Sequence, residues 1–386
     1  MSNSEKSAYI TSISSFLPNE PVDNDHMEEM LGLATTKPSR ARRIVLRNNG
    51  IKQRHYAIDP VTKEANYTNA QLAANAIKML ENDDFSIDQI DSLTASTTIP
   101  DQIMPNHGVM VHGLLKNPSC EVVSTSGVCL CGVTAMRNAY NGVLAGQYNK
   151  AVACASEAAS FFLRGKNYEE ETDARINALE ENPIIAFEKD FLRWMLSDGA
   201  GAVLIEPEPK QEGISFRIDW MDILSYADEV DTCMYAGSEK QEDGSIKGWT
   251  QFSPKEVMEQ AVLVPKQDVK LLNDKMPHYF EKFLARTMER HNLTGEEIDW
   301  YLPHVSSFYF WETMLGIFEK LDFKVPKEKC FTNLETKGNT GSASIYIMLD
   351  ELYRTKDLQD GQKILLFIPE SGRFSTGYVM LTVVKK

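Results

Sequence analysis

The sequence lacks any run of about 18 apolar residues, the length that a membrane-crossing helix requires. We therefore expect no transmembrane helix and no membrane partner. The opening residues, MSNSEKSAYITS, contain neither the basic segment nor the apolar core of a signal peptide. These two absences predict a cytoplasmic protein.

Cysteines are few and scattered. Six occur in 386 residues, at positions 120, 129, 131, 154, 233 and 330. This spacing is typical of reduced thiols in the cytoplasm rather than of a disulfide framework. Cys129 and Cys131 form one C-x-C pair, but no second pair or histidine cluster supplies zinc-like spacing. We expect no metal site and no cofactor.

Basic residues are fewer than acidic ones. The chain has 55 acidic and 40 basic residues, and its net charge of −15 at pH 7 makes nucleic acid a poor partner. Residues 37–54 reverse this balance, with seven basic residues and no acidic one. The segment is either a solvated loop that pairs with neighbouring carboxylates or a landing site for an anionic partner.

Strands and helices alternate along the chain. The apolar patterns predict strands over residues 9–17, 92–99 and 151–155, and helices over 68–82 and 105–115. Such alternation predicts an α/β fold with largely parallel strands.

The two halves of the sequence share short matching segments. Residues 85–96 (FSIDQIDSLTAS) match residues 293–304 (LTGEEIDWYLPH) at an offset of 208, and Gly146 matches Gly361 at an offset of 215. Because the two offsets are similar and the order is the same, the pattern predicts a duplicated unit.

Residues 121–146 contain a candidate nucleophile. The pattern predicts a strand at 121–124, a tight turn, and a helix that begins at Cys129 and stops at Gly146. A cysteine in the first turn of a helix faces unpaired N–H groups and the positive end of the dipole, which favour the thiolate. The alternative is a small buried cysteine that packs as a hydrophobe.

Two further polar residues are expected near Cys129. The duplication aligns Cys129 with residues 337–344, which contain Asn339, and it puts His304 at the carboxyl end of a strand, where ligands bind in parallel sheets. A thiolate can accept an acyl group, and histidine and asparagine can donate to an enolate oxygen, which fits Claisen chemistry. Taken singly, His304 and Asn339 are equally compatible with a core histidine and a turn or helix cap.

The same trio in the same order serves papain-type cysteine proteases, where the asparagine orients the histidine. The sequence lacks the CG[SA]C[WY] signature of that class. This absence weighs against a protease.

The motifs around these residues resemble those of thiolase-fold condensing enzymes, closest to β-ketoacyl-acyl-carrier-protein synthase III. The resemblance covers nearly the whole chain, and the segments that carry it are YITSISSFLP, NNGIKQRHYA, SDGAGAVLI, LPHVSS, KGNTGSAS and ESGRFSTG. It implies thiolase-like duplicated βαβαβ halves in a five-layer α-β-α-β-α arrangement. Residues 1–207 form the half that carries the nucleophile Cys129, and residues 208–386 form the half that carries His304 and Asn339.

The resemblance also implies a function. A homodimeric ketosynthase would join two acyl thioesters, delivered by acyl carrier protein, through an acyl intermediate on Cys129. The backbone N–H groups of Cys129 and Gly372 would form the oxyanion hole, and Met104 would reach the acyl pocket of the partner. The alternative functions are decarboxylative synthase III chemistry in fatty-acid initiation, acyl transfer without condensation, and the role of an inactive partner subunit.

Several positions depart from the family pattern. Ile44 stands where coenzyme-A-binding members carry tryptophan, which favours carrier-protein delivery of both substrates. We expect the carrier protein to dock on Arg40, Arg42, Arg43 and Arg47.

Polar insertions at residues 166–182 and 229–248, together with Arg373 in place of a loop glycine, resemble a narrower subgroup. That subgroup forms dialkylresorcinols through cyclohexanediones, from a β-ketoacyl thioester and an α,β-unsaturated acyl thioester. Glu157 is a candidate for an extra acid or base, and the alternative is a structural carboxylate.

Overall fold

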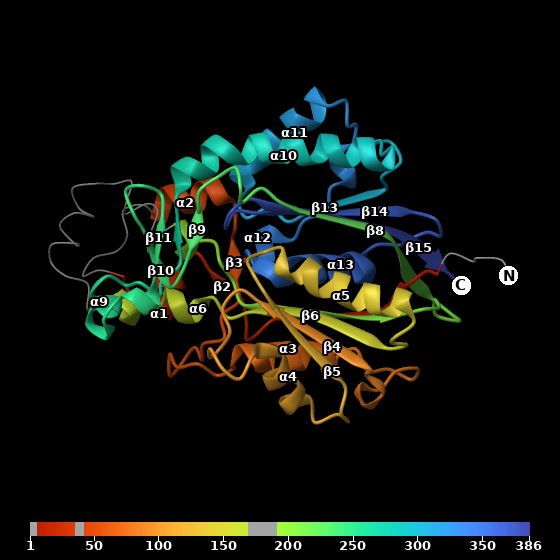
Figure 1. Cartoon of the computed structure of the whole chain (residues 1–386), viewed down its shortest axis with the longest axis horizontal. Helices are drawn as coiled ribbons and strands as arrows, with labels where there is room; N and C mark the ends of the chain where they lie inside the picture. The colour runs from red at the N-terminus through yellow and green to blue at the C-terminus, as the bar shows by residue number, and fades with distance from the viewer. Residues whose placement is uncertain (1–5, 35–41, 169–190) are drawn as a thin grey trace.

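The computed structural model describes residues 6–34, 42–168 and 191–386. Helices and strands alternate in five layers, α-β-α-β-α, from top to bottom of the molecule (Figure 1). Helices α5 and α13 form the middle layer, with strands on both sides of them and further helices outside the strands. The predicted α/β fold and its layer order are confirmed. The expectation of largely parallel strands is wrong, because five of the eight strand pairings in the main sheet of the described residues are antiparallel.

Nine strands form the main sheet of the described residues, in the order β13-β14-β15-β8-β1-β7-β6-β4-β5. Their bounds are β1 Tyr9–Phe16, β4 Ser92–Thr97, β5 Glu121–Ser126, β6 Ala151–Glu157, β7 Gly199–Glu206, β8 Ile214–Ser225, β13 Trp300–Pro303, β14 Lys363–Glu370 and β15 Ser375–Lys385. In Figure 1 the two groups of strands lie above and below the middle helices. Only two residue pairs, Tyr9 with Arg217 and Ile10 with Phe216, join β1 to β8 between the groups.

The two groups of strands have the same internal order. Starting from the junction, β1 pairs antiparallel with β7, β7 antiparallel with β6, and β6 and β4 lie parallel, followed by β5. On the other side β8 pairs antiparallel with β15, β15 antiparallel with β14, and β14 lies parallel to β13. A parallel bridge from Tyr301 to Cys330 stands where β5 stands in the first group. This equivalence agrees with the predicted repeat, while the division at residues 207 and 208 stays a prediction.

Burial explains why these segments are strands. All six residues of β4 and all seven of β6 are buried, and apart from Leu93 and Glu157 their side chains are small or β-branched, so helices pack closely on both faces. The outer helices are α3 (Asn69–Lys78) and α4 (His107–Leu115) on one side, and α10 (Val269–His291) and α11 (Trp311–Lys320) on the other. Helix α3 begins at a capping box formed by Thr68 and Gln71.

The middle helices touch each other. They are α5 (Cys131–Ala145) and α13 (Ser344–Thr355), and α13 follows the short 3-10 turn η6 (Gly341–Ala343). The hydroxyl group of Tyr346 donates a hydrogen bond of 2.7 Å to the carbonyl of Gly132. A Cβ at Gly132 would lie 2.3 Å from the carbonyl oxygen of Ser342, so only glycine allows this approach. The contact joins the two halves beside the loop that carries Cys129.

The remaining elements are short. Those near the N-terminus are β2 Val22–Asp23, α1 Met27–Leu31, α2 Arg42–Asn49, β3 Gln53–Arg54, η1 Ile87–Gln89, α6 Ser160–Leu163 and η2 Gly165–Tyr168. Those in the second half are β9 Met234–Tyr235, β10 Ser238–Lys240, β11 Ile246–Gly248, η3 Trp249–Gln251, α9 Pro254–Glu259, β12 Lys266–Gln267, η4 Phe308–Phe310, η5 Lys327–Lys329 and α12 Leu334–Lys337.

Two regions for which the sequence suggested irregular loops contain helices or strands. The basic segment contains helix α2, and the insertion at residues 229–248 contains β9, β10 and β11, which pair with neighbouring strands. Most of the insertion at residues 166–182 lies outside the described residues.

Candidate active site

A cavity of about 880 Å³ opens at the carboxyl ends of the strands. Its polar end is lined by Cys129, Glu157, His304, Asn339 and Glu370. Cys129 follows β5, Glu157 ends β6, His304 follows β13, and Glu370 ends β14. Since these strands are parallel within each group, their ends meet at one edge, where ligands bind in sheets of this kind. The structure thus brings the three predicted residues Cys129, His304 and Asn339 to one cavity.

Cys129 lies before the helix rather than in it. Helix α5 begins at Cys131, with Leu130 as its N-cap, so the expected helix start at Cys129 is wrong by two residues. The Cys129 side chain is buried, and burial raises its pKa well above the ordinary value, with smaller contributions from the charges of Glu370 and Glu157. The predicted preference for the thiolate is therefore wrong for the resting cavity, because desolvation and two carboxyl groups outweigh the helix dipole.

His304 stands at the end of β13 with a free imidazole. Its backbone N–H donates a 2.7 Å hydrogen bond to the carbonyl of Phe367, which extends the β13–β14 pairing by one residue. The residue is 2% exposed, and neither ring nitrogen has a hydrogen-bond partner among the described residues. Burial lowers the pKa of His304 to about 4, so the ring is neutral near pH 7. A neutral imidazole with unused nitrogens can donate to, or take a proton from, a bound substrate.

Asn339 is fixed by its backbone. Its N–H donates to the carbonyl of Met195 at 3.0 Å, and its carbonyl accepts from the N–H of Ser197 at 2.8 Å. The side-chain Oδ1 accepts from the N–H of Gly341 at 2.9 Å, which leaves the Nδ2 group as the donor on the cavity side. Gly338 before it has φ of 69°, a conformation that favours glycine.

Glu157 is buried between the two halves. Its carboxylate accepts hydrogen bonds from the Thr98 hydroxyl group at 2.6 Å and from the Thr98 N–H at 3.1 Å, and it also accepts from the hydroxyl group and N–H of Ser342. Burial raises the pKa of Glu157 to about 7, although these donors pull it down. A carboxyl group with this pKa exchanges protons near neutral pH.

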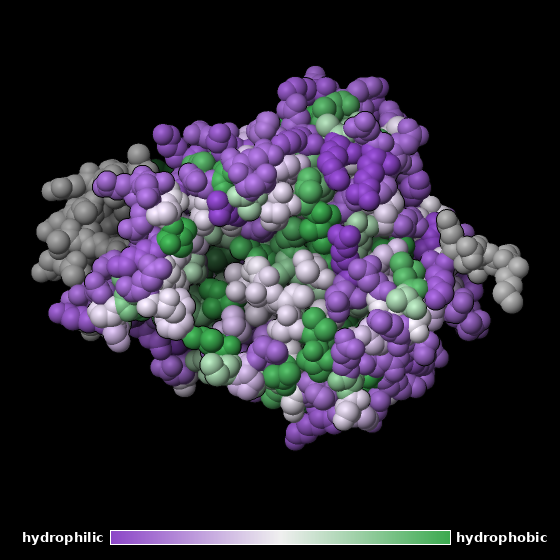
Figure 2. Space-filling model, in the orientation of Figure 1, coloured by the Kyte–Doolittle hydropathy of each residue, from purple (hydrophilic) through white to green (hydrophobic). Residues whose placement is uncertain are grey.

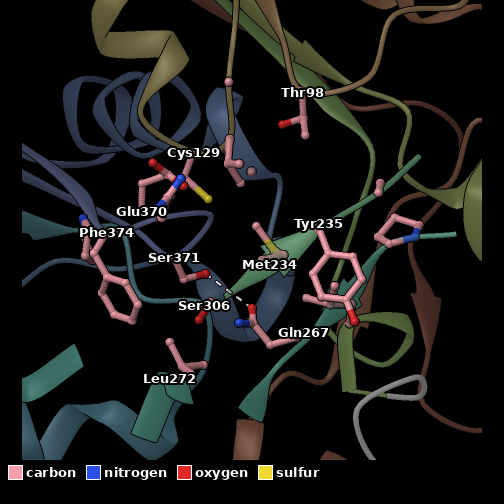
Figure 3. Close-up of a pocket in the computed structure, with 18 of the residues that line it drawn as sticks. Thr98, Cys129, Met234, Tyr235, Gln267, Leu272, Ser306, Glu370, Ser371 and Phe374 are labelled. Atoms are coloured by element: carbon pink, nitrogen blue, oxygen red, sulfur yellow. Dashed lines mark hydrogen bonds between the residues drawn. The ribbon is translucent and has the colours of Figure 1, made fainter. Parts of the chain in front are cut away.

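Gly372 lies in the loop between β14 and β15, and a Cβ built on it would lie 3.0 Å from the side chain of Val128, the residue before Cys129. Its carbonyl accepts from the N–H groups of Cys233 at 2.8 Å and Met234 at 3.2 Å, which holds the following peptide unit from the insertion side. Its own N–H donates to Oε1 of Glu370. Figure 3 shows Glu370 beside Cys129.

The sequence reasoning missed Glu370 and Gln267. Gln267 in β12 is 2% exposed, and its Nε2 donates to the carbonyl of Cys233 at 3.0 Å. Its Oε1 accepts a 3.3 Å hydrogen bond from Ser371, drawn as a dashed line in Figure 3. A carboxylate directly before a Ser-Gly pair at the end of an apolar strand was the available signal for Glu370.

Asp231, Asp243 and Arg373 add further polar lining, and one stretch of the cavity wall is apolar. Leu272, Met276 and Phe280 of α10 line it, with Phe310 and Met314 from the segment after His304. Leu272 and Phe374 are seen on this side in Figure 3. Such a wall fits an extended hydrocarbon chain.

The other predicted site residues lie outside this cavity. Met104 is 79% exposed, close to Ile103 at 72%. Arg43 and Arg47 are exposed on α2, whereas Arg42 is bound to Glu28 at 2.9 Å, so Arg42 is a structural cation rather than a free docking group. Arg40 lies outside the described residues.

Residues 6–34, 42–168 and 191–386 contain neither a helix long and apolar enough to cross a membrane nor a cluster of residues suited to a metal ion.

Comparison with known proteins agrees with this geometry. Residues 288–382 match the family model for the C-terminal part of 3-oxoacyl-[acyl-carrier-protein] synthase III. The β-ketoacyl-[acyl-carrier-protein] synthase III of Wolbachia pipientis is 26% identical, over 97% of this chain and 98% of that protein. The corresponding enzyme of Xanthomonas oryzae is 24% identical, over 96% and 97%.

Solved structures share the fold. The tetronic acid condensing enzyme AbyA1 superposes with a TM-score of 0.73 at 18% identity, covering 97% of this chain and 99% of that chain. OleA of Xanthomonas campestris, solved with lauric acid and lauroyl-CoA, gives a TM-score of 0.73 at 15% identity, over 98% and 99%.

The fold and the sequence relatives define a thiolase-fold condensing enzyme, and therefore an acyltransferase. More narrowly, it is similar to ketosynthases of the synthase III type, in the C-terminal segment that the family model matches and in its sequence relatives.

Proposed function

We propose that this enzyme joins two acyl thioesters by Claisen-type condensation through an acyl intermediate on Cys129. The observation that carries the proposal is the meeting of Cys129, His304 and Asn339 in one cavity, part of whose wall is apolar. A nucleophile, two neutral donors and a hydrocarbon pocket are the parts that such a reaction requires.

The first half of the reaction loads the enzyme. Because the thiol of Cys129 is protonated in the resting cavity, it passes its proton to a cavity group as it attacks the thioester carbonyl. The N–H groups of Cys129 and Gly372 stabilise the oxyanion, and collapse of the tetrahedral adduct releases the carrier thiol. One thioester replaces another, so this step changes the free energy little.

The second half forms the carbon–carbon bond. Glu157 takes the proton from the α-carbon of the second thioester, while His304 and Asn339 donate to its carbonyl oxygen and stabilise the enolate. That proton returns to the thiolate of Cys129 once the thiolate is expelled. The enolate carbon attacks the acyl carbonyl on Cys129 and expels the thiolate. Glu157, with a pKa of about 7, supplies proton transfer for a subsequent ring closure.

The substrates we propose are a β-ketoacyl thioester and an α,β-unsaturated acyl thioester, both on acyl carrier protein, with a cyclohexanedione precursor of a dialkylresorcinol as product. The apolar wall beyond the polar end supports long acyl groups. Arg43 and Arg47 on the exposed face of α2 support docking of an acidic carrier. Because all six cysteines are free, we place the enzyme in the cytoplasm.

We also propose a homodimer. Strand β5 ends the sheet order of the described residues, and an open edge strand is usually covered in a native assembly. In Figure 2 hydrophobic residues gather across the middle of the face that carries α5 and β5 in Figure 1, between hydrophilic rims. The exposed side chains of Ile103 and Met104 support a partner near this edge.

The test is product analysis by mass spectrometry with a β-ketoacyl carrier thioester and an unsaturated acyl carrier thioester. We expect a product that contains the carbons of both acyl groups, and none with Cys129→Ala. Free acids alone would instead favour acyl transfer without condensation. A product formed from a malonyl carrier thioester, but not from the β-ketoacyl one, would favour decarboxylative fatty-acid initiation.

A further inference from the structure

The backbone donor assigned to the oxyanion hole is already occupied. Oε1 of Glu370 accepts the hydrogen bond of the Gly372 N–H. A Cβ built on Gly372 would lie 2.3 Å from the same oxygen, which shows how closely the carboxylate covers this peptide. The Gly372 carbonyl, which belongs to the following peptide unit, is held by the N–H groups of Cys233 and Met234, so the loop is anchored next to this donor. The oxygen of a bound thioester can accept from the Gly372 N–H only when the Glu370 carboxylate releases that hydrogen bond.

The same carboxylate lies beside the nucleophile. Figure 3 shows Glu370 next to Cys129, and its charge is the main contribution after burial to the raised pKa of the Cys129 thiol. Glu370 is itself half-buried, and desolvation raises its pKa. A proton therefore has a short route from one group to the other.

The other titratable groups around Glu370 come from different elements. Glu157 approaches from β6 and the neutral His304 from the end of β13. Arg373, in the same loop, donates from Nε to the carbonyl of Val230 at 2.9 Å. Of these groups, Glu370 alone combines a place beside the thiol with a hold on the oxyanion donor.

We propose that Glu370 takes the proton of Cys129 and, by doing so, opens the oxyanion hole. The inference rests on the proposed function, because it assigns the group that accepts the proton in the loading step.

The step balances without a co-reactant. The S–H bond of Cys129 breaks, and its proton binds Oε1 of Glu370. The neutral carboxyl group is a weaker acceptor, so it releases the Gly372 N–H to the incoming thioester oxygen. The thiolate adds to the carbonyl carbon, the bond from that carbon to the carrier sulfur breaks, and the leaving thiolate takes the proton from Glu370. The carboxylate then closes on Gly372 again.

Electrostatics favours this coupling. A thiolate beside a carboxylate would place two negative charges in a buried site, which is costly. Transfer of the proton between them keeps one negative charge throughout. The nucleophile and the open oxyanion hole consequently appear together.

Two substitutions separate titration from shape. Glu370→Gln keeps the length and an acceptor oxygen but takes no proton under these conditions. Glu370→Asp keeps the titrating carboxyl group, and an aspartate readily accepts from the N–H two residues on, as in an Asx turn. We expect Glu370→Gln to slow acylation of Cys129 by a carrier thioester about 100-fold, the usual effect of a lost general base, and Glu370→Asp to retain most of the rate.

A second readout on Glu370→Gln moves in the opposite direction. Alkylation of Cys129 by iodoacetamide needs the thiolate but not the oxyanion hole. Without the neighbouring carboxylate, we expect its rate at pH 7 to rise about tenfold, since one unit of thiol pKa changes the thiolate fraction tenfold. A purely structural role for Glu370 would not raise alkylation while lowering acylation.

Certain results would overturn the inference. Acylation of Glu370→Gln at the wild-type rate would do so, as would Glu370→Asp acylating as slowly as Glu370→Gln. If Glu370→Gln does not fold, Glu370→Ala with added formate replaces it, and failure of formate to raise acylation counts against the proposal. If the wild-type enzyme forms no acyl adduct on Cys129, the proposed function itself is wrong. If wild type forms the adduct and Glu370→Gln forms it at the same rate, only the role of Glu370 is wrong.

Discussion

Replacing Glu157 with glutamine should make the protein progressively more stable than wild type as the pH rises. The four hydrogen bonds from Thr98 and Ser342 reach Oε1, so a glutamine with its amide oxygen in that place keeps the acceptor. The side chain is 5% exposed, so the exchange removes a buried titrating group at nearly constant shape.

The size of this stability difference follows from the raised pKa of Glu157. Burial raises the pKa of Glu157 from 4.5 to about 7 in the folded protein. A raised carboxyl pKa stabilises the folded state below pH 4.5, and this contribution is lost as the pH rises through 7, because the unfolded chain releases its proton first. Between pH 5 and pH 8 the loss is about 2.5 kcal/mol. Glutamine does not titrate, so the stability of Glu157→Gln relative to wild type should grow by this amount.

Urea unfolding of both proteins at pH 5, 6, 7 and 8 measures the difference. The exposed exchange Glu208→Gln controls for the loss of one carboxylate from an acidic protein. Asp198, whose pKa burial raises to about 6, is present in every variant and cancels from the comparison. A difference that stays constant from pH 5 to pH 8 would refute the assignment of Glu157 as a desolvated carboxyl group.

Three further predictions follow from other contacts. Tyr346→Phe removes the hydrogen bond to Gly132 and should lower the free energy of unfolding by about 1 kcal/mol in urea titration, while an unchanged value would count against this contact between the halves. Arg43→Glu combined with Arg47→Glu should raise the KM for a carrier thioester severalfold with little change in kcat, and equal KM values would remove α2 as the docking site. If the proposed homodimer forms through this edge, Met104→Glu should give a monomer in light scattering where wild type gives a dimer, and a dimeric variant would place the interface elsewhere.

The main site could be predicted because its residues sit in motifs tied to strand ends. Cys129, His304 and Asn339 come from three distant segments, yet the repeat and the alternation of strands and helices were enough to predict their meeting at one edge. The helix start was misplaced because Val128 accepts the N–H of Cys131, which adds a turn before α5. The spacing of apolar residues in the sequence does not reveal such a turn.

What could not be predicted depends on side chains that cross between segments. The thiolate preference was wrong because burial, and to a smaller extent the charges of Glu370 and Glu157, raise the pKa of Cys129, and the local sequence around the cysteine shows neither. The short strands β9 and β12 are held by pairing with each other rather than by their own pattern. Helix α2 buries only Val45 and Asn49 and is otherwise largely polar and basic, so its apolar content resembles that of a loop.

The central claim is that the acyl group on Cys129 ends in a new carbon–carbon bond. The direct measurement loads wild-type enzyme with a ¹³C-labelled acyl carrier thioester, removes the excess, and follows the label in a single turnover after the second thioester is added. The account predicts a labelled adduct on Cys129 that disappears as labelled condensation product appears at the same rate. Label released only as free acid, or product formed without passing through the adduct, would contradict it.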